Sequence, residues 1–76
     1  MHYKIEYCVT WNYFPAASRA ADEIKEVYPD AQVELIESGG GIFDVTCDTK
    51  MVYSKKNTRE NRFPEDGEIA SLVKNI

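Results

Sequence analysis

The chain has 76 residues, which allows one domain over residues 1–76 with a thin hydrophobic core. Its formal net charge of −4 argues against nucleic acid or an anionic membrane as the main partner, because both require clustered Lys and Arg. The first residues are too polar for a signal peptide, and no apolar run reaches the roughly 18 residues of a membrane span. A cytoplasmic protein is therefore expected.

Two cysteines and one histidine are too few and too widely spaced for a structural zinc site or a disulfide framework. The chain also contains no serine–histidine–aspartate set and no phosphate-binding glycine loop. We therefore expect neither a metal nor a cofactor.

Hydrophobic periodicity predicts the elements in the first half of the chain. Apolar and polar residues alternate over residues 3–9, which indicates a half-buried strand. A helical pattern follows, beginning near Tyr13 or Phe14 and ending before Pro29, because proline is tolerated in a first turn and stops a helix elsewhere. A second alternating strand covers residues 31–37.

The second half contains two more strands and a helix. Glycines at residues 39–41 break the pattern, and residues 42–48 and 51–55 then read as two strands joined by a tight turn, which predicts a hairpin. A polar loop leads to a helix over residues 63–76.

The resulting order is β-α-β-β-β-α. A right-handed crossover makes the first two strands parallel. The strands alternate in polarity, whereas strands covered on both faces read as continuous apolar runs. The predicted fold class is therefore α/β, a two-layer sandwich with a four-stranded mixed sheet and both helices on one face.

Cys8 ends the first predicted strand, just before the first helix. Reactive groups of open α/β sheets gather at such strand ends, and the positive pole of a helix stabilises a thiolate, which is the nucleophile of thiol–disulfide exchange. Free cysteine is also one of the most buried residue types. Position alone therefore leaves a reactive and a structural Cys8 equally open.

Cys47 lies on the apolar side of the third predicted strand and is interpreted as a core residue. If that strand runs antiparallel to the first, Cys47 and Cys8 lie near opposite ends of the sheet. A disulfide between them is not expected, because it needs Cα atoms within roughly 7 Å.

Two more features are predicted near Cys8. The connection to the third strand carries three glycines: Gly39, Gly40 and Gly41. They allow close approach of another chain and should face Cys8, although a merely flexible connection is the alternative. Trp11 falls outside both periodic patterns and is the aromatic residue most expected to be exposed, where it could stack over a ligand or cover Cys8.

The polar loop carries a basic group in this acidic chain: Lys55, Lys56, Arg59 and Arg62. These side chains could receive the carboxylates of glutathione or an acidic partner surface. A solvated loop is the simpler interpretation.

Four segments, in this order, resemble the selenoprotein W-like (Rdx) family: "IEYCVTWNY", "SGGGIFDV", "MVYSKK" and "RFPEDGEIASLV". Members of this family have a strand ending in Tyr-Cys-x-x-Cys or Cys-x-x-selenocysteine, a Gly-rich loop before the third strand and a Phe-Pro element before the last helix. The resemblance implies a thioredoxin-like fold and a redox role linked to glutathione or to a partner protein thiol. It also implies that Cys8 is the first redox cysteine.

Trp11 stands at the second redox position, so "CVTW" replaces Cys-x-x-Cys. A dithiol cycle needs a second thiolate to resolve the mixed disulfide, and no such activity is expected. Cys8 could act alone as a monothiol oxidoreductase, through a mixed disulfide or glutathionylation that an external thiol reverses. The alternative is a non-catalytic interaction module in which Trp11, Tyr13 and the glycines form a contact patch.

Overall fold

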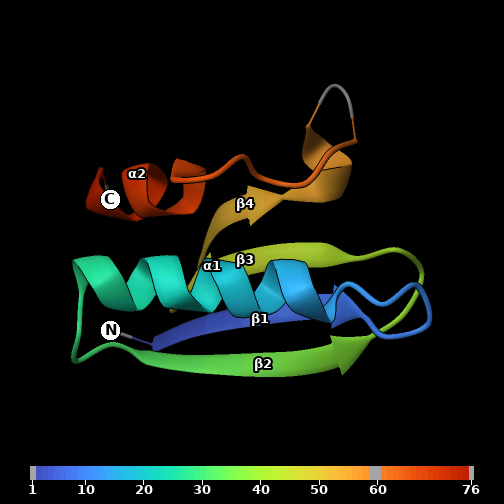
Figure 1. Ribbon diagram of the computed structural model, residues 1–76, viewed down its shortest axis with the longest axis horizontal. Coiled ribbons are helices and arrows are strands. Elements are labelled where there is room, and N and C mark those ends of the chain that lie inside the picture. Colours follow the sequence, from blue (N-terminus) through green and yellow to red (C-terminus); the bar gives the residue numbers. More distant parts are fainter. Residues whose placement is uncertain (1, 59–60, 76) are drawn as a thin grey trace.

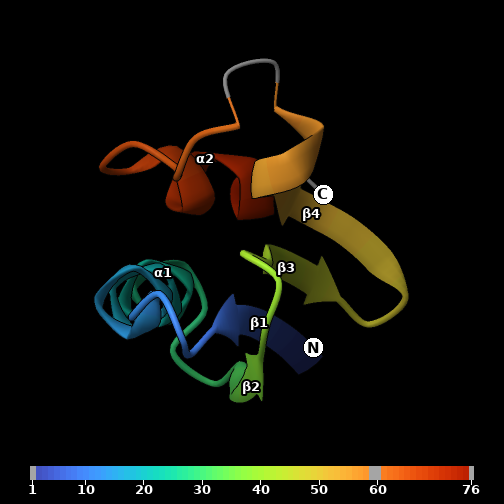
Figure 2. The same cartoon turned by 90° about the vertical axis from the view of Figure 1, so that its right-hand side faces the viewer.

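A mixed four-stranded sheet forms one layer of the protein and two helices form the other (Figures 1 and 2). The computed structural model describes residues 2–58 and 61–75. The elements are β1 (His2–Cys8), α1 (Phe14–Val27), β2 (Gln32–Ser38), β3 (Phe43–Cys47), β4 (Lys50–Ser54), the short 3-10 helix η1 (Lys55–Asn57) and α2 (Glu68–Lys74).

The strands lie in the order β2-β1-β3-β4. β1 is parallel to β2 and antiparallel to β3, and β3 is antiparallel to β4. Both helices lie on the same side of this sheet (Figure 2). The α/β two-layer sandwich predicted from the sequence is therefore confirmed, and β1 is a central strand whose last residue is Cys8.

The core lies between the sheet and the helices. Its sheet residues alternate along the strands and are Tyr3, Ile5, Tyr7, Phe43, Val45, Cys47 and Tyr53. The helices contribute Ala17, Ala20, Ile24, Ile69 and Val73. Small alanine side chains let α1 lie close to the sheet, and the interpretation of Cys47 as a core residue is confirmed.

The last helix is shorter than the predicted span of residues 63–76, of which residue 76 lies outside the described residues. α2 begins at Glu68, because Gly67 has a φ of +83°, a conformation that a helix interior does not contain. The carboxylate of Glu23 on α1 accepts the N–H groups of Gly67 at 3.0 Å and of Ala70 at 3.1 Å. Glu23 thus caps the start of α2 and joins the two helices.

Candidate functional site

Backbone hydrogen bonds fix Cys8 between two loops. Its N–H donates to the carbonyl of Ile42 at 2.9 Å, and its carbonyl accepts the N–H of Tyr13 at 3.0 Å. The first bond joins Cys8 to the segment 39–42, which leads into β3. The second joins it to the segment 9–13, which leads into α1. Cys8 therefore lies where these two connections meet the end of β1.

The thiol of Cys8 is shielded from solvent without belonging to the main core. Cys8 is 1% exposed. The apolar cluster beneath the helices includes Tyr7 but not Cys8, as expected because successive side chains of a strand point to opposite faces. This burial excludes an open, solvent-facing nucleophile. It is compatible with a structural thiol and with a reactive thiol that is reached by local opening.

The start of α1 lies close to Cys8 in the chain. Asn12 has a φ of 58°, which reverses the chain between β1 and α1. The N-cap residue Tyr13 makes no side-chain capping bond, and Pro15 occupies the first turn. Pro15 has no N–H to donate. The positive pole of α1 therefore faces the end of the sheet that carries Cys8, with one donor fewer than an ordinary first turn.

Trp11, at the second redox position, packs against the glycine loop. Its side chain is 63% exposed, which confirms the expectation that it lies outside the core. A Cβ built on Gly41 would lie 2.7 Å from Cζ3 of the indole and 3.3 Å from Cε3. Gly41 also has a φ of +72°, so both its conformation and the indole favour glycine at this position.

The other two glycines do not share this contact. A Cβ on Gly39 or on Gly40 would meet nothing within 4 Å. The glycine connection and the Cys8 loop are adjacent, as the topology predicted, but only Gly41 touches Trp11. Gly39 and Gly40 are exposed. They form the turn before β3 and do not pack against Trp11.

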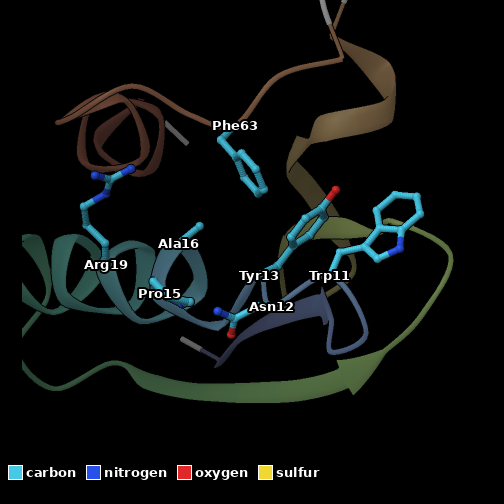
Figure 3. Close-up of a pocket in the computed structure, with 7 residues that line it drawn as sticks. All are labelled: Trp11, Asn12, Tyr13, Pro15, Ala16, Arg19 and Phe63. Atoms are coloured by element: carbon cyan, nitrogen blue, oxygen red, sulfur yellow. The ribbon is translucent and has the colours of Figure 1, made fainter.

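A groove of about 360 Å³ opens beside this loop. Its lining consists of Trp11, Asn12, Tyr13, Pro15, Ala16, Arg19 and Phe63 (Figure 3). The rings of Tyr13 and Phe63 point toward one another, with centroids 4.6 Å apart and planes at 81°, an edge-to-face contact. Trp11 and Arg19 lie at opposite ends of the groove in this view. Cys8 is not part of the lining, so the groove lies beside the loop that follows Cys8 and is not the access route to its thiol.

Two residues of the basic group, Lys55 and Arg62, make contacts within the protein. Nζ of Lys55 lies 5.6 Å from the Tyr13 ring centroid and 5.5 Å from that of Phe63, within the range of cation–π contacts. Arg62 donates to both carboxylate oxygens of Glu68 at 2.8 and 3.2 Å. This arrangement holds the pKa of Glu68 below its usual value, chiefly through the hydrogen bond from Arg62. Arg59 lies outside the described residues.

Cys47 lies far from Cys8. Cys47 is opposite Tyr3 in the register of β1 and β3, and Cys8 is five residues further along β1, roughly 16 Å at 3.3 Å per residue. Both cysteines are free. Burial, together with a hydrogen bond to Cys47, raises the pKa of Tyr3 to about 12.

The groove includes residues that the sequence did not mark as part of a site, among them Arg19 and Phe63. The helical pattern of the sequence gives Arg19 no role beyond the polar side of α1, and the sequence places Phe63 in a helix that in the structure begins only at Glu68. No local signal marks either residue, because they line the same groove although they are 44 positions apart in the chain.

Within residues 2–58 and 61–75, no group of three His, Cys, Asp or Glu side chains is placed to hold a metal ion. In the same part of the chain, no helix has the length and hydropathy needed to cross a bilayer.

Solved structures that are similar to this one include two bacterial proteins. A protein from Bordetella parapertussis has a TM-score of 0.85 and 21% sequence identity, with 97% of this chain and 94% of that chain covered. A selenoprotein W-related protein from Vibrio cholerae has a TM-score of 0.84 and 22% identity, with 97% and 92% covered. These likenesses concern the fold, and they confirm the thioredoxin-like two-layer sandwich.

No curated protein matches the chain significantly. The family model described as the Rdx family matches residues 2–75, which is nearly the whole chain and agrees with the resemblance carried by the four sequence segments. This match, on a fold shared with a selenoprotein W-related protein, shows that the chain belongs to the Rdx family.

Proposed function

We propose that this protein takes part in thiol redox chemistry through one cysteine, Cys8, which forms a mixed disulfide with glutathione or with a partner protein. Membership of the Rdx family supports a redox-related role at the level of the family. The single observation that carries the monothiol form of the proposal is the residue at the second redox position. Three positions after Cys8, where a dithiol protein has its second cysteine, this chain has Trp11. With Cys47 at the other end of the sheet, no second sulfur is available to resolve a mixed disulfide.

The proposed step is an exchange in which the Cys8 thiolate attacks one sulfur of a disulfide, such as oxidised glutathione. A bond forms between the Cys8 sulfur and the attacked sulfur, and the original disulfide bond breaks. The other half leaves as a thiolate and takes up a proton, while the proton of Cys8 passes to solvent. Cys8 is thereby oxidised and the departing thiol is reduced, and a second external thiol reverses the reaction.

Because Cys8 is 1% exposed, this chemistry requires the loop 9–13 to open. Opening would break the backbone bonds from Val9 N–H to Ser38 O and from Tyr13 N–H to Cys8 O, both at 3.0 Å, while residues 9–12 are already exposed. Local opening of such segments needs much less free energy than global unfolding. The contact of Trp11 with Gly41 is one side-chain interaction that opening would break, and the contact of Tyr13 with Phe63 is another.

The experiment is incubation of the native protein with oxidised glutathione, followed by intact mass and peptide mapping. The proposal predicts one glutathione per chain on Cys8, full reversal by reduced thiol, and no adduct on the Cys8→Ser variant. The matched Cys47→Ala variant should retain the adduct. An adduct confined to Cys47, or no adduct below the unfolding transition, would overturn the proposal.

A second function, protein interaction without redox chemistry, is favoured by one specific observation. Val9, Trp11 and Phe14 are 48%, 63% and 49% exposed, which is unusual for large apolar side chains clustered within six positions of the chain. If this function holds in place of the first, Cys8→Ser will retain all partner binding and the wild-type thiol will form no adduct.

A further inference from the structure

We infer that the groove beside Cys8 binds an extended segment of a partner protein that carries an apolar side chain followed, two positions later, by an acidic one. The inference deepens the proposed function and rests on it in one respect only, because the partner held in this groove is taken to be the protein whose thiol exchanges with Cys8. Cys8 itself is reached by opening of the loop 9–13 and not through the groove, whose lining does not include it. The binding itself involves no thiol chemistry.

The apolar half of the inference comes from the lining. Trp11, Tyr13, Pro15 and Phe63 present aromatic and aliphatic surface along most of the groove. Trp11 is largely exposed although it is the only tryptophan of the chain, and exposed aromatic residues at a concave site are typical anchors for a partner's apolar side chain.

The acidic half comes from charge. The chain has a formal net charge of −4, yet the described residues that line the groove include a cation, Arg19, and no carboxylate. Lys55 adds a second positive charge above Tyr13 and Phe63. The positive charge of this groove, in a protein that is acidic as a whole, is complementary to a carboxylate on the partner.

The existing partner of Arg19 can be exchanged. Nη1 of Arg19 lies 3.0 Å from Oδ1 of Asp66, whose side chain is 87% exposed. Exposed ion pairs of this kind contribute little to stability. A guanidinium offers five donors in a planar fork, so Arg19 can receive a second carboxylate beside Asp66 or release Asp66 in favour of it.

The spacing follows from the geometry of α1. Arg19 comes four residues after Pro15 on the same helix, which corresponds to about 6 Å along the axis at 1.5 Å per residue. An extended peptide covers that length with two residues at about 3.3 Å each. An apolar side chain over Pro15 and Trp11 therefore places a carboxylate two positions later within reach of Arg19.

The fluorescence of Trp11 provides a direct measurement, because no other tryptophan contributes to the emission. The probe is the blocked peptide acetyl-Ser-Leu-Ser-Glu-Ser-amide, and its control is the same peptide with Gln in place of Glu. We expect a saturable change in emission with both peptides. The Glu peptide should bind about 5-fold more tightly, the factor that corresponds to an exposed ion pair of about 1 kcal/mol.

Variants separate the specific contact from general charge. Arg19→Gln should abolish the preference for Glu over Gln, while Lys25→Gln, which removes an exposed charge from the far end of α1, should retain it. Equal binding of the two peptides to the wild type, a preference that survives Arg19→Gln, or no saturable change would overturn the inference. Cys8→Ser should bind both peptides as the wild type does, so a failure of glutathione adduct formation and a failure of peptide binding are distinguished.

Discussion

The indole of Trp11 lies on the backbone of Gly41 so closely that a Cβ at residue 41 would be 2.7 Å from Cζ3. This contact joins the loop after β1 to the loop before β3. Cys8 lies between the same two loops, with its N–H bonded to Ile42 and its carbonyl to Tyr13. The aromatic residue at the second redox position thus helps to join the two loops between which Cys8 lies.

Alanine substitutions at the three glycines test the contact between Trp11 and Gly41, because the three positions differ in φ and in the space available for a Cβ. Gly39→Ala should be nearly neutral, because its Cβ meets nothing within 4 Å and its φ is not positive. Gly40→Ala meets nothing either but has a φ of +67°, so it should cost about 1 kcal/mol of unfolding free energy. Gly41→Ala adds the collision with Trp11. We expect it to cost more than Gly40→Ala, to change the Trp11 emission and to speed alkylation of Cys8 by about 10-fold or more, the factor for 1.4 kcal/mol.

Equal alkylation rates in Gly40→Ala and Gly41→Ala, corrected for any global unfolding measured in urea, would show that the indole contact does not limit access to Cys8.

Restoring a sulfur at position 11 should restore dithiol chemistry. Residues 8 and 11 lie on the tight connection between β1 and α1, where Asn12 N–H bonds to the carbonyl of Val9 at 2.9 Å. We expect Trp11→Cys to form an internal disulfide with Cys8 on mild oxidation and to catalyse reduction of a small disulfide. Thiol counting and mass spectrometry measure both states, with Cys8→Ser combined with Trp11→Cys as the one-thiol control. Persistence of two free thiols would contradict the assigned geometry.

The link between the helices should be measurable in stability. Glu23 accepts two N–H groups at the start of α2, and loss of a capping acceptor typically costs about 1 kcal/mol and up to about 2. We therefore expect Glu23→Ala to lower the unfolding free energy by about 1 to 2 kcal/mol in urea. Glu26→Ala, an exposed position on the same helix, should change it by less than about 0.5 kcal/mol. Equal effects of the two variants would contradict a capping role.

The ion pair of Arg62 and Glu68 predicts a dependence of stability on acid. Its hydrogen bond lowers the pKa of Glu68 below 4.5 in the folded state. The contribution is therefore present above pH about 4.5, the unfolded value, and is lost as the pH falls through the folded pKa. The wild type should lose up to about 1 kcal/mol more than Glu68→Gln between pH 6 and pH 3, the scale of a partly exposed pair. Parallel stability curves for the two proteins would rule this contribution out.

The sequence predicted the layers of the protein because its apolar residues repeat with clear periods. The alternation of Tyr3, Ile5 and Tyr7 and the spacing of Ala17, Ala20 and Ile24 each specify one buried face, and the structure buries those faces. The end of α1 was predicted because Pro29 stops a helix.

The site was less accessible to such reasoning, since it depends on contacts between segments distant in the chain. No pattern in the local sequence indicates that Cys8 is buried. Likewise, none indicates that Trp11 packs on Gly41 or that Phe63 contacts Tyr13. The start of α2 was misplaced because the left-handed conformation of Gly67 and the carboxylate of Glu23 decide it. Residues 63–67 therefore precede the helix, and Phe63 lines the groove.

The most direct test of the central claim is the rate of alkylation of each cysteine at urea concentrations below the unfolding transition. A thiol reached only by global unfolding reacts at a rate that rises steeply with urea, following the slope of the unfolding free energy, whereas a thiol reached by local opening reacts at a nearly constant rate. Cys47, in the core, is the internal reference for global unfolding. The account predicts a flat rate for Cys8 and a steep one for Cys47; the same steep dependence for both would contradict it.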